Sequence, residues 1–316
     1  MPSVTVRSKN NPHIVYTYDF DNLIFDRSRI AMAFVGRQMK NESSSDVIIQ
    51  VYNFSNISEI WKRKLQYSIV NFAKESRRPF IDVFFDDTSN CSREYMYLIR
   101  EFHQEITLED FLSGKNLNNF NDAQNHLYQI FNSPDRAKVA SDILLRILSE
   151  VQYLNDLGIC SIDVHPSAVL VKSECEIELL DFGITKLLER NNNENNRFCI
   201  IDRNLTEYEA PEEIVIGSYK YITQQTDVYA IGILYFQLIT GNLPFKGALY
   251  DVLQSQLHES VPIKQITHPT IRTIIKKATA KDIKKRFDSC SHFIAAIEDI
   301  DFSEKIQYSW WQKIFK

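Results

Sequence analysis

Hydrophobic residues follow two different periods in this chain, and the change from one to the other constrains the fold more than any other feature. In the first 103 residues they gather in short runs rich in β-branched and aromatic side chains: RIAMAFVG, DVIIQVYNF, FIDVFFDD and YMYLIREF. The polar stretch KNESSS between the first two runs predicts a hairpin with a loose connection. Only residues 56–76 show helical spacing in this part. A small, strand-rich lobe with one helix is therefore expected.

Helical spacing dominates the remainder of the chain. Residues 137–159 carry apolar side chains three, four and seven positions apart, and Gly158 stands where a helix commonly ends. Similar patterns cover 226–240, 248–258, 270–279 and 288–299. The expected fold class is α+β, with a strand-rich lobe at 1–103, a larger helical lobe at 104–303 and an amphipathic aromatic tail at 304–316.

Charge and cysteine content exclude several classes of protein. Among 316 residues, 36 Lys and Arg face 41 Asp and Glu, so the net charge of −5 gives no bulk attraction to nucleic acid or to an anionic membrane. The five cysteines show no CxxC spacing, which favours a reducing, cytoplasmic setting over disulfides or zinc. The N-terminus lacks the apolar segment of a secretory signal. The longest apolar run, 228–236, is too short to span a bilayer and predicts a buried core helix.

Four motifs follow one another in the second half of the chain. They are IELLDFGITKLL at 177–188, YEAPE at 208–212, TDVYAIGILYFQLITGNLPF at 226–245 and ATAKDIKKRF at 278–287. In this order and spacing they resemble the Ser/Thr protein kinase fold, and the C-terminal half is most similar to bacterial Hanks-type kinases. The resemblance, which covers roughly residues 15–300, implies two lobes with a nucleotide cleft between them. It also implies that phosphoryl transfer would need a glycine-rich lid, a lysine, two Mg²⁺ ligands and a base.

The N-terminal catalytic parts that the resemblance implies are missing. The lid would lie at 22–34, a stretch that contains no glycine to let backbone amides approach phosphates. Gln50 stands where the strand lysine is expected, and a neutral amide brings no charge to a triphosphate. The helix 56–76 should supply a glutamate near 66–69, and none is present there.

Arg100 and Glu101 align with the gatekeeper and hinge positions at the nucleotide cleft. A buried Arg100 must be paired and would reach an acid such as Asp181. Alternatively, a shift of one residue in the strand register would point Arg100 to solvent. Gln50, Arg100, Glu101 and Asp181 are together the candidate lining of a vestigial cleft.

The stretch CSIDVHPSAVLV aligns with the catalytic loop of the family. Asp163 keeps the position of the base, whereas Ser161 and Ile162 replace the histidine and arginine before it. His165 replaces the loop lysine; it donates to a phosphate when protonated, or is simply a hydrogen-bonded loop residue. Ala168 replaces an asparagine that binds Mg²⁺, and it offers no oxygen.

Other residues at family positions are retained. Asp181 of the DFG motif would bind a metal ion or, like Asp163, cap a turn by accepting backbone N–H bonds. Glu212 and Arg286 match a buried ion pair of the family. Asp227 matches the helix aspartate that braces the catalytic loop.

The catalytic residues that are missing and the structural residues that are retained favour a pseudokinase. Such a protein acts as a scaffold or allosteric partner with little or no phosphotransfer. It is expected to bind no cofactor, or to bind ATP and Mg²⁺ weakly. One alternative is an atypical active Ser/Thr protein kinase, or another nucleotide-dependent transferase, that uses Asp163 and Asp181. A second is a nucleotide-independent interaction subunit of a larger assembly. The expected partners are proteins, and the tail 304–316 either docks on a partner or membrane surface or packs back on the helical lobe.

Overall fold

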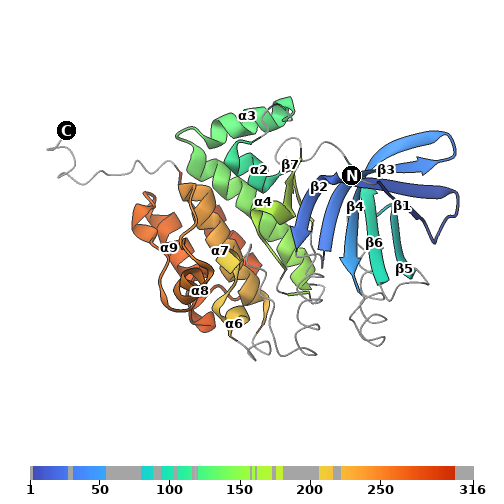
Figure 1. The fold of residues 1–316 in the computed structure, drawn as a ribbon. Coiled ribbons are helices and arrows are strands. Elements are labelled where there is room, and N and C mark those ends of the chain that lie inside the picture. Colours follow the sequence, from blue (N-terminus) through green and yellow to red (C-terminus); the bar gives the residue numbers. More distant parts are fainter. Residues whose placement is uncertain are drawn as a thin grey trace. The chain divides into compact units, whose positions relative to one another are not determined.

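The computed structural model of the chain describes residues 3–27, 31–54, 80–87, 94–102, 106–115, 118, 120–156, 159–160, 162–172, 176–180, 206–215 and 222–302. Internal contacts divide the chain into unit 1, Met1–Thr107 with Leu180–Asp202, and unit 2, Leu108–Leu179 with Arg203–Lys316. Unit 1 is built on strands and unit 2 mainly on helices (Figure 1). The expected α+β class is thereby confirmed.

Unit 1 contains an antiparallel sheet of six described strands. They are β1 (Val4–Arg7), β2 (Ile14–Arg27), β3 (Ala31–Lys40), β4 (Ser43–Asn53), β5 (Asp82–Asp87) and β6 (Glu94–Glu101), in the spatial order β1-β2-β3-β4-β6-β5; β7 (Ile106–Thr107) follows. Lys40 pairs with Ser43, so β3 and β4 continue into the polar stretch that predicted a loose connection. Asn41, with a φ of 55°, makes this two-residue turn possible. The predicted helix 56–76 lies outside the described residues.

Side chains of β4 alternate between the two faces of the sheet, as the strand period of two requires. One face carries a buried core rich in aromatic rings, made of Val6, Tyr16, Tyr18, Phe34, Val47, Ile49, Val51, Phe84, Tyr97 and Ile99. Gln50 and its neighbours Ile49 and Val51 therefore point to opposite sides. A side chain at Gly36 would collide with Ile49, which explains the glycine at that position of β3.

The two edge strands approach each other over this core. Asn10, just after β1, donates from Nδ2 to Oδ1 of Asp82 at 2.7 Å and to the carbonyl of Val83 at 2.9 Å, both in β5. Tyr16 of β2 donates its hydroxyl to Oδ2 of Asp82 at 3.0 Å, and its ring stacks on Phe84. Figure 1 shows β1 beside β5. The sheet is curled around its apolar face, which removes that face from water.

Unit 2 consists mainly of helices. They are α2 (Leu108–Ser113), α3 (Asp122–Phe131), α4 (Arg136–Asp156), α6 (Pro211–Ile214), α7 (Gln224–Thr240), α8 (Leu249–His258), α9 (Pro269–Ala278) and α10 (Cys290–Glu298), with 3₁₀ turns at Pro166–Ala168, Thr206–Tyr208, Ile263–Gln265 and Ile283–Lys285. β8 (Val169–Val171) and β9 (Ile177–Leu179) pair as an antiparallel hairpin. The helices predicted from apolar spacing are α4 and α7 to α10, and they are confirmed.

Helix α7 is apolar on all sides and lies within unit 2. All of residues 228–236 are buried, so this run forms the predicted core helix. The Thr223 side chain accepts a hydrogen bond from the Gln225 N–H at the start of the helix, and Gly241 ends it with a φ of 73°. In the described part of the chain, no helix combines the length and the apolar character needed to cross a membrane.

Replacing Tyr16 by Phe removes only the hydroxyl that donates to Asp82. Because Asp82 is 8% exposed, water cannot readily replace the lost donor. We expect the free energy of unfolding of unit 1 to fall by about 1–3 kcal/mol, measured by urea unfolding. Tyr250→Phe is the matched control, since the Tyr250 side chain is 70% exposed, and it should change nothing. Equal midpoints for wild type and Tyr16→Phe would contradict a closing role of this bond.

Candidate functional site

The loop at residues 162–168 is held by a carboxylate from the core of unit 2. Asp227, 1% exposed on α7, accepts a hydrogen bond at Oδ1 from the backbone N–H of Ile162 at 2.6 Å. Its Oδ2 accepts another from Nδ2 of Asn155 at 3.1 Å. A hydrogen bond from a backbone N–H to an ionised acceptor is stronger than a neutral one. These are the contacts that a bracing role of Asp227 requires.

Three polar side chains of this loop follow one another in space. Nδ1 of His165 is 2.8 Å from Oγ of Ser167, and Nε2 of His165 is 3.7 Å from Oδ2 of Asp163. Asp163 and His165 are both buried, and the His165 ring packs against Tyr208 with centroids 6.4 Å apart. The sequence pointed to Asp163 and His165. It did not single out Ser167, for which the only signal was its place two residues after His165.

Two apolar side chains of the loop occupy positions where the resemblance implies charge or metal binding. Ile162 stands at the arginine position and Ala168 at the asparagine position, and both are buried. Neither side chain has a polar atom, so neither can contact a phosphate or a metal ion. Ser161 lies outside the described residues.

Gln50 is buried in unit 1, on the face of β4 opposite the aromatic core. Its Nε2 donates to the hydroxyl of Tyr52 at 3.0 Å and to the backbone carbonyl of Leu180. Both donor hydrogens of the amide are thus used within the protein. Oε1 of Gln50 accepts no hydrogen bond, so the site offers a ligand one neutral acceptor and no positive charge from this residue.

Arg100 is 5% exposed in β6, which rules out the alternative that it points to solvent. It pairs with Ile48 across the β4–β6 ladder, while Gln50 pairs with Leu98 two residues away. Residues two apart in a strand share a face. Arg100 and Gln50 therefore lie on the same face of the sheet, whereas the exposed Glu101 belongs to the other.

Of the site residues predicted from the sequence, some belong to the described part of the chain and others do not. Asp181 and the tail 304–316 lie outside the described residues, so the metal and docking roles predicted for them stay predictions. Gln50, Arg100 and Glu101 belong to unit 1, and Asp163 and His165 to unit 2.

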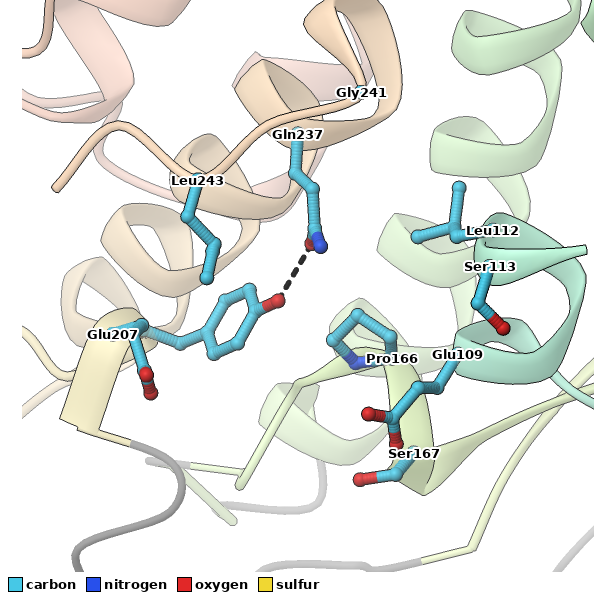
Figure 2. A pocket seen from close by; sticks show the side chains of 10 residues that line it. Glu109, Leu112, Ser113, Pro166, Ser167, Glu207, Gln237, Gly241 and Leu243 are labelled. Atoms are coloured by element: carbon cyan, nitrogen blue, oxygen red, sulfur yellow. Dashed lines mark hydrogen bonds between the residues drawn. The ribbon is translucent and has the colours of Figure 1, made fainter. Parts of the chain in front are cut away.

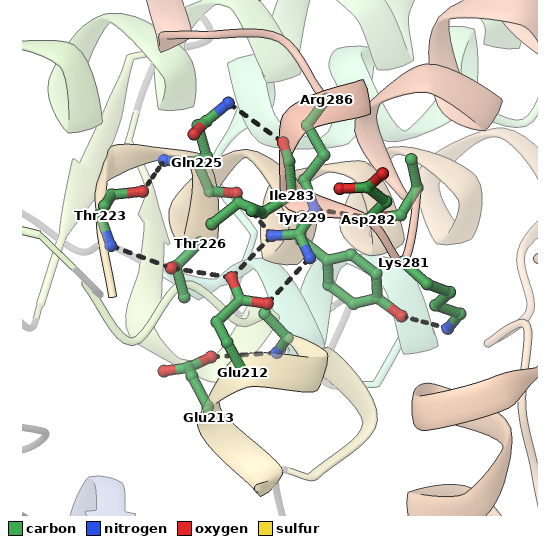
Figure 3. A network of polar contacts seen from close by, with 12 residues as sticks. Glu212, Glu213, Thr223, Gln225, Thr226, Tyr229, Lys281, Asp282, Ile283 and Arg286 are labelled. Atoms are coloured by element: carbon green, nitrogen blue, oxygen red, sulfur yellow. Dashed lines mark hydrogen bonds and ion pairs between the residues drawn. The ribbon is translucent and has the colours of Figure 1, made fainter. Parts of the chain in front are cut away.

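Glu212 and Arg286 form a bidentate ion pair in unit 2 (Figure 3). The guanidinium Nη1 and Nη2 atoms lie 2.7 and 2.8 Å from the two carboxylate oxygens, and the Arg286 side chain is fully buried. Thr226 of α7 also donates to Glu212 at 2.9 Å, and Arg286 donates to the carbonyl of Gln225. Each charge therefore has several partners, as burial requires. The pair connects α6 to α7 and to the segment before α10.

A second polar cluster surrounds Lys281. Its Nζ donates to the hydroxyl of Tyr229 at 2.7 Å and to the carbonyls of Gln256 at 2.6 Å and Ser255 at 3.2 Å. Burial, with the nearby Arg286, lowers the pKa of Lys281 to about 8. The amide of Gln256 accepts from Tyr229 and donates to the carbonyl of Glu207. This cluster fixes the turn at 206–208 against α8.

A pocket of about 330 Å³ opens in unit 2 beside the loop at 162–168 (Figure 2). Its walls come from α2, the loop, the turn at 206–208 and the end of α7. The lining residues are Glu109, Leu112, Ser113, Pro166, Ser167, Glu207, Tyr208, Gln237, Gly241 and Leu243. The hydroxyl of Tyr208 donates to Oε1 of Gln237 at 2.6 Å, which fixes one wall. No sequence motif predicted this pocket, because its walls come from four separate segments.

The pocket has a negative character. Within the described residues, neither Glu109 nor Glu207 has an ion-pair partner. Burial raises the pKa of Glu207; a hydrogen bond to its own backbone offsets part of this, and the neighbouring Glu209 adds to it. A cation in the pocket would relieve this unfavourable carboxylate environment, whereas an anion would add to it.

Comparison with known proteins agrees with the motifs. Residues 33–301 match the family described as protein kinase domain. Over 198 residues, 60% of this chain and 28% of the relative, the chain is 31% identical to the probable serine/threonine-protein kinase PknB of Lactococcus lactis. Over 207 residues, 64% of this chain and 28% of the relative, it is 25% identical to the serine/threonine-protein kinase PrkC of Bacillus subtilis. The matched part thus spans less than a third of either relative.

Glu212→Ala leaves the buried Arg286 guanidinium without its carboxylate. We expect the free energy of unfolding of unit 2 to fall by about 3–5 kcal/mol, the usual cost of one uncompensated buried charge, measured by urea unfolding. The double variant Glu212→Ala, Arg286→Met should recover part of this loss, because no isolated charge remains. The exposed Glu298 provides the control, and Glu298→Ala should have little effect. A loss below about 1 kcal/mol for Glu212→Ala would contradict the anchoring role.

Glu207→Gln should raise the melting temperature at neutral pH. The pKa of Glu207 in the folded protein lies above its ordinary value of 4.5, so the protonated form stabilises the fold. That contribution is complete below pH 4.5 and is lost as the pH rises through the folded pKa. Glutamine imitates the neutral acid, so its advantage should disappear on acidification, as thermal unfolding from about pH 7 down to about pH 4 would record. A variant less stable than wild type at neutral pH would refute this.

Proposed function

The chain belongs to the protein kinase family, and we propose that it is a pseudokinase: a scaffold or allosteric partner with little or no phosphotransfer. The environment of Gln50 is the observation that carries this proposal. A kinase needs a cation on the triphosphate at this strand position. Here a neutral amide is buried, and its two donor hydrogens are bonded to Tyr52 and to the Leu180 carbonyl.

The loop at 162–168 supports the same proposal. Ala168 provides no oxygen for Mg²⁺, and Ile162 provides no cation for a phosphorylated segment. Both side chains are buried, so a water molecule does not readily take the place of the missing group. These described residues do not fit Mg²⁺-ATP, and we derive no transfer step through it.

Retained scaffold contacts support a protein-binding role for a folded domain. Asp227 holds the loop, and the Glu212–Arg286 pair joins α6 to the segment before α10. Contacts of this kind stabilise a fixed surface and need no nucleotide. In this proposal Asp163 and His165 are residual catalytic positions. Gln50, Arg100, Glu101 and Asp181 are then the vestigial cleft, and Asp181 is a residual candidate for binding a metal ion.

The proposed organisation keeps the lobes 1–103 and 104–303 and the tail 304–316. We infer that the partner is a protein, with the amphipathic tail as one docking surface. The scattered cysteines support a reducing, cytoplasmic setting. Because the chain spans less than a third of the Lactococcus lactis and Bacillus subtilis kinases, these assignments concern this chain and not the activity of those full-length proteins.

A radiolabel transfer assay tests the proposal. The full chain is incubated with labelled ATP, generic protein substrates and Mg²⁺ or Mn²⁺, beside an active bacterial Ser/Thr kinase as the positive control. We expect incorporation at the level of the protein-free blank, and the same level for Asp163→Ala and Asp181→Ala. Robust transfer that either substitution abolishes would refute the pseudokinase proposal and establish the alternative of an atypical active kinase.

Nucleotide binding is measured separately from transfer. A ligand that binds only the folded state raises the melting temperature, so Mg²⁺-ATP should leave thermal unfolding unchanged. Stabilisation without transfer would still fit a pseudokinase, one with weak nucleotide binding. Stabilisation together with transfer would support the active kinase.

A further inference from the structure

The loop that lacks the groups for phosphate chemistry holds a hydroxyl, an imidazole and a carboxylate in sequence. We propose that Ser167 is a nucleophilic serine, with His165 as its general base and Asp163 as the residue that orients His165. The serine takes the acyl group of a neutral or cationic ester bound in the adjoining pocket. This activity goes beyond the pseudokinase proposal and does not depend on it.

The distances place the base next to the nucleophile. Oγ of Ser167 lies 2.8 Å from Nδ1 of His165, within hydrogen-bond reach of a proton acceptor. On the other side of the ring, Nε2 lies 3.7 Å from Oδ2 of Asp163. At 3.7 Å the carboxylate is beyond hydrogen-bond reach of Nε2, so Asp163 acts on the ring through its charge. The tautomer with its hydrogen on Nε2 faces that charge and leaves Nδ1 to accept from the serine. Roles, and not sequence order, identify this combination of groups.

Burial separates the base from water and leaves the nucleophile accessible. His165 is 1% exposed and Asp163 is 7% exposed, whereas Ser167 lines the pocket. The Tyr208 ring packs against His165, and Tyr208 is itself fixed by its hydrogen bond to Gln237. The hydrogen bond at Nδ1 and the neighbouring Tyr208 ring keep the orientation of His165, which general-base catalysis requires.

The pocket determines which ester fits. Its volume of about 330 Å³ lies at the lower end of the range for small-molecule sites. Leu112, Leu243 and Pro166 provide apolar walls for an acyl chain (Figure 2). Glu109 and Glu207 have no ion-pair partner in the described part of the chain, so they attract cationic substrates and repel anionic ones.

The chemical step balances without a cofactor. The Ser167 oxygen forms a bond to the carbonyl carbon while its proton moves to Nδ1 of His165. The bond from that carbon to the alkoxy oxygen then breaks, and the alcohol leaves with the proton from His165. Water hydrolyses the acyl-serine, which releases a carboxylic acid and restores the hydroxyl.

A neutral alkyl fluorophosphonate tests the nucleophile directly. Attack forms an oxygen–phosphorus bond at the serine and releases fluoride, and the stable adduct is located by intact mass and peptide mapping of the full chain. We expect one adduct per chain, at Ser167. Ser149 is the control because it is exposed on α4 outside the pocket, and its hydroxyl donates to the carbonyl of Leu145. Ser149→Ala should therefore be labelled at the wild-type rate.

The base is tested by substitution. Ser167→Ala should give no adduct, and His165→Ala should slow labelling by about 100-fold or more, the usual contribution of a general base. Thermal unfolding of each variant checks that it is folded. Absence of an adduct on the folded wild type, an adduct at Ser113 or elsewhere, or labelling unchanged in a folded His165→Ala would each overturn the proposal. The wild-type peptide map alone decides the first two outcomes, even if a variant fails to fold.

The preference of the pocket for cationic substrates is tested by comparing the labelling rates of two reagents of opposite charge. A fluorophosphonate bearing a carboxylate should label Ser167 at least about tenfold more slowly than one bearing a quaternary ammonium group. The double variant Glu109→Gln, Glu207→Gln should narrow this difference. Equal rates for the two reagents on the wild type would overturn the assigned substrate class. The ATP assay is unaffected by any of these results, since a protein without phosphotransfer can still carry a reactive serine.

Discussion

The hydrogen bond from the Ile162 backbone to Asp227 is the contact that ties the loop at 162–168 to the core of unit 2. Asp227 lies on a helix that is apolar on every side, where an unpaired carboxylate would be strongly destabilising. Its oxygens accept hydrogen bonds from the Ile162 N–H and the Asn155 amide, which stabilise the carboxylate and also fix the loop. The loop anchored in this way carries Asp163 and His165, and it contributes Pro166 and Ser167 to the pocket wall.

The buried charged groups described in unit 2 mainly connect helices to one another. The Glu212–Arg286 pair and the bonds of Lys281 connect helices, and each of these charges has several partners. By contrast, Gln50 in unit 1 and Ala168 in unit 2, which the sequence resemblance aligns with phosphate-binding and metal-binding positions, are neutral. A stable scaffold and a catalytic centre draw on different residues, and in the pseudokinase proposal this chain retains the first set. That separation underlies both the pseudokinase proposal and the different use proposed for the loop.

Much of the fold could be predicted from the chain, but the long-range contacts could not. Apolar spacing identified α4 and α7 to α10, because a helix of two or more turns repeats its own pattern. It missed β1, since a four-residue strand carries little periodicity and gains its stability from pairing with β2. Apolar spacing also underestimated the length of the hairpin at KNESSS. Backbone pairing between the strands, and not apolar side chains, extends β3 and β4 there.

For the site, the sequence by itself determined which side chains are present. Position 50 carries a neutral amide, position 168 carries a methyl group without an oxygen, and position 227 carries a carboxylate. Those conclusions are local, because the atoms that a side chain carries are given by the sequence, whatever surrounds them in the fold. Only the tertiary structure decided that Arg100 is buried, that Asn10 closes the sheet against Asp82, and that the pocket joins four segments around Ser167. Such contacts join residues far apart in the sequence. They depend on how the helices and strands pack, and the spacing of apolar residues along the chain carries no signal for them.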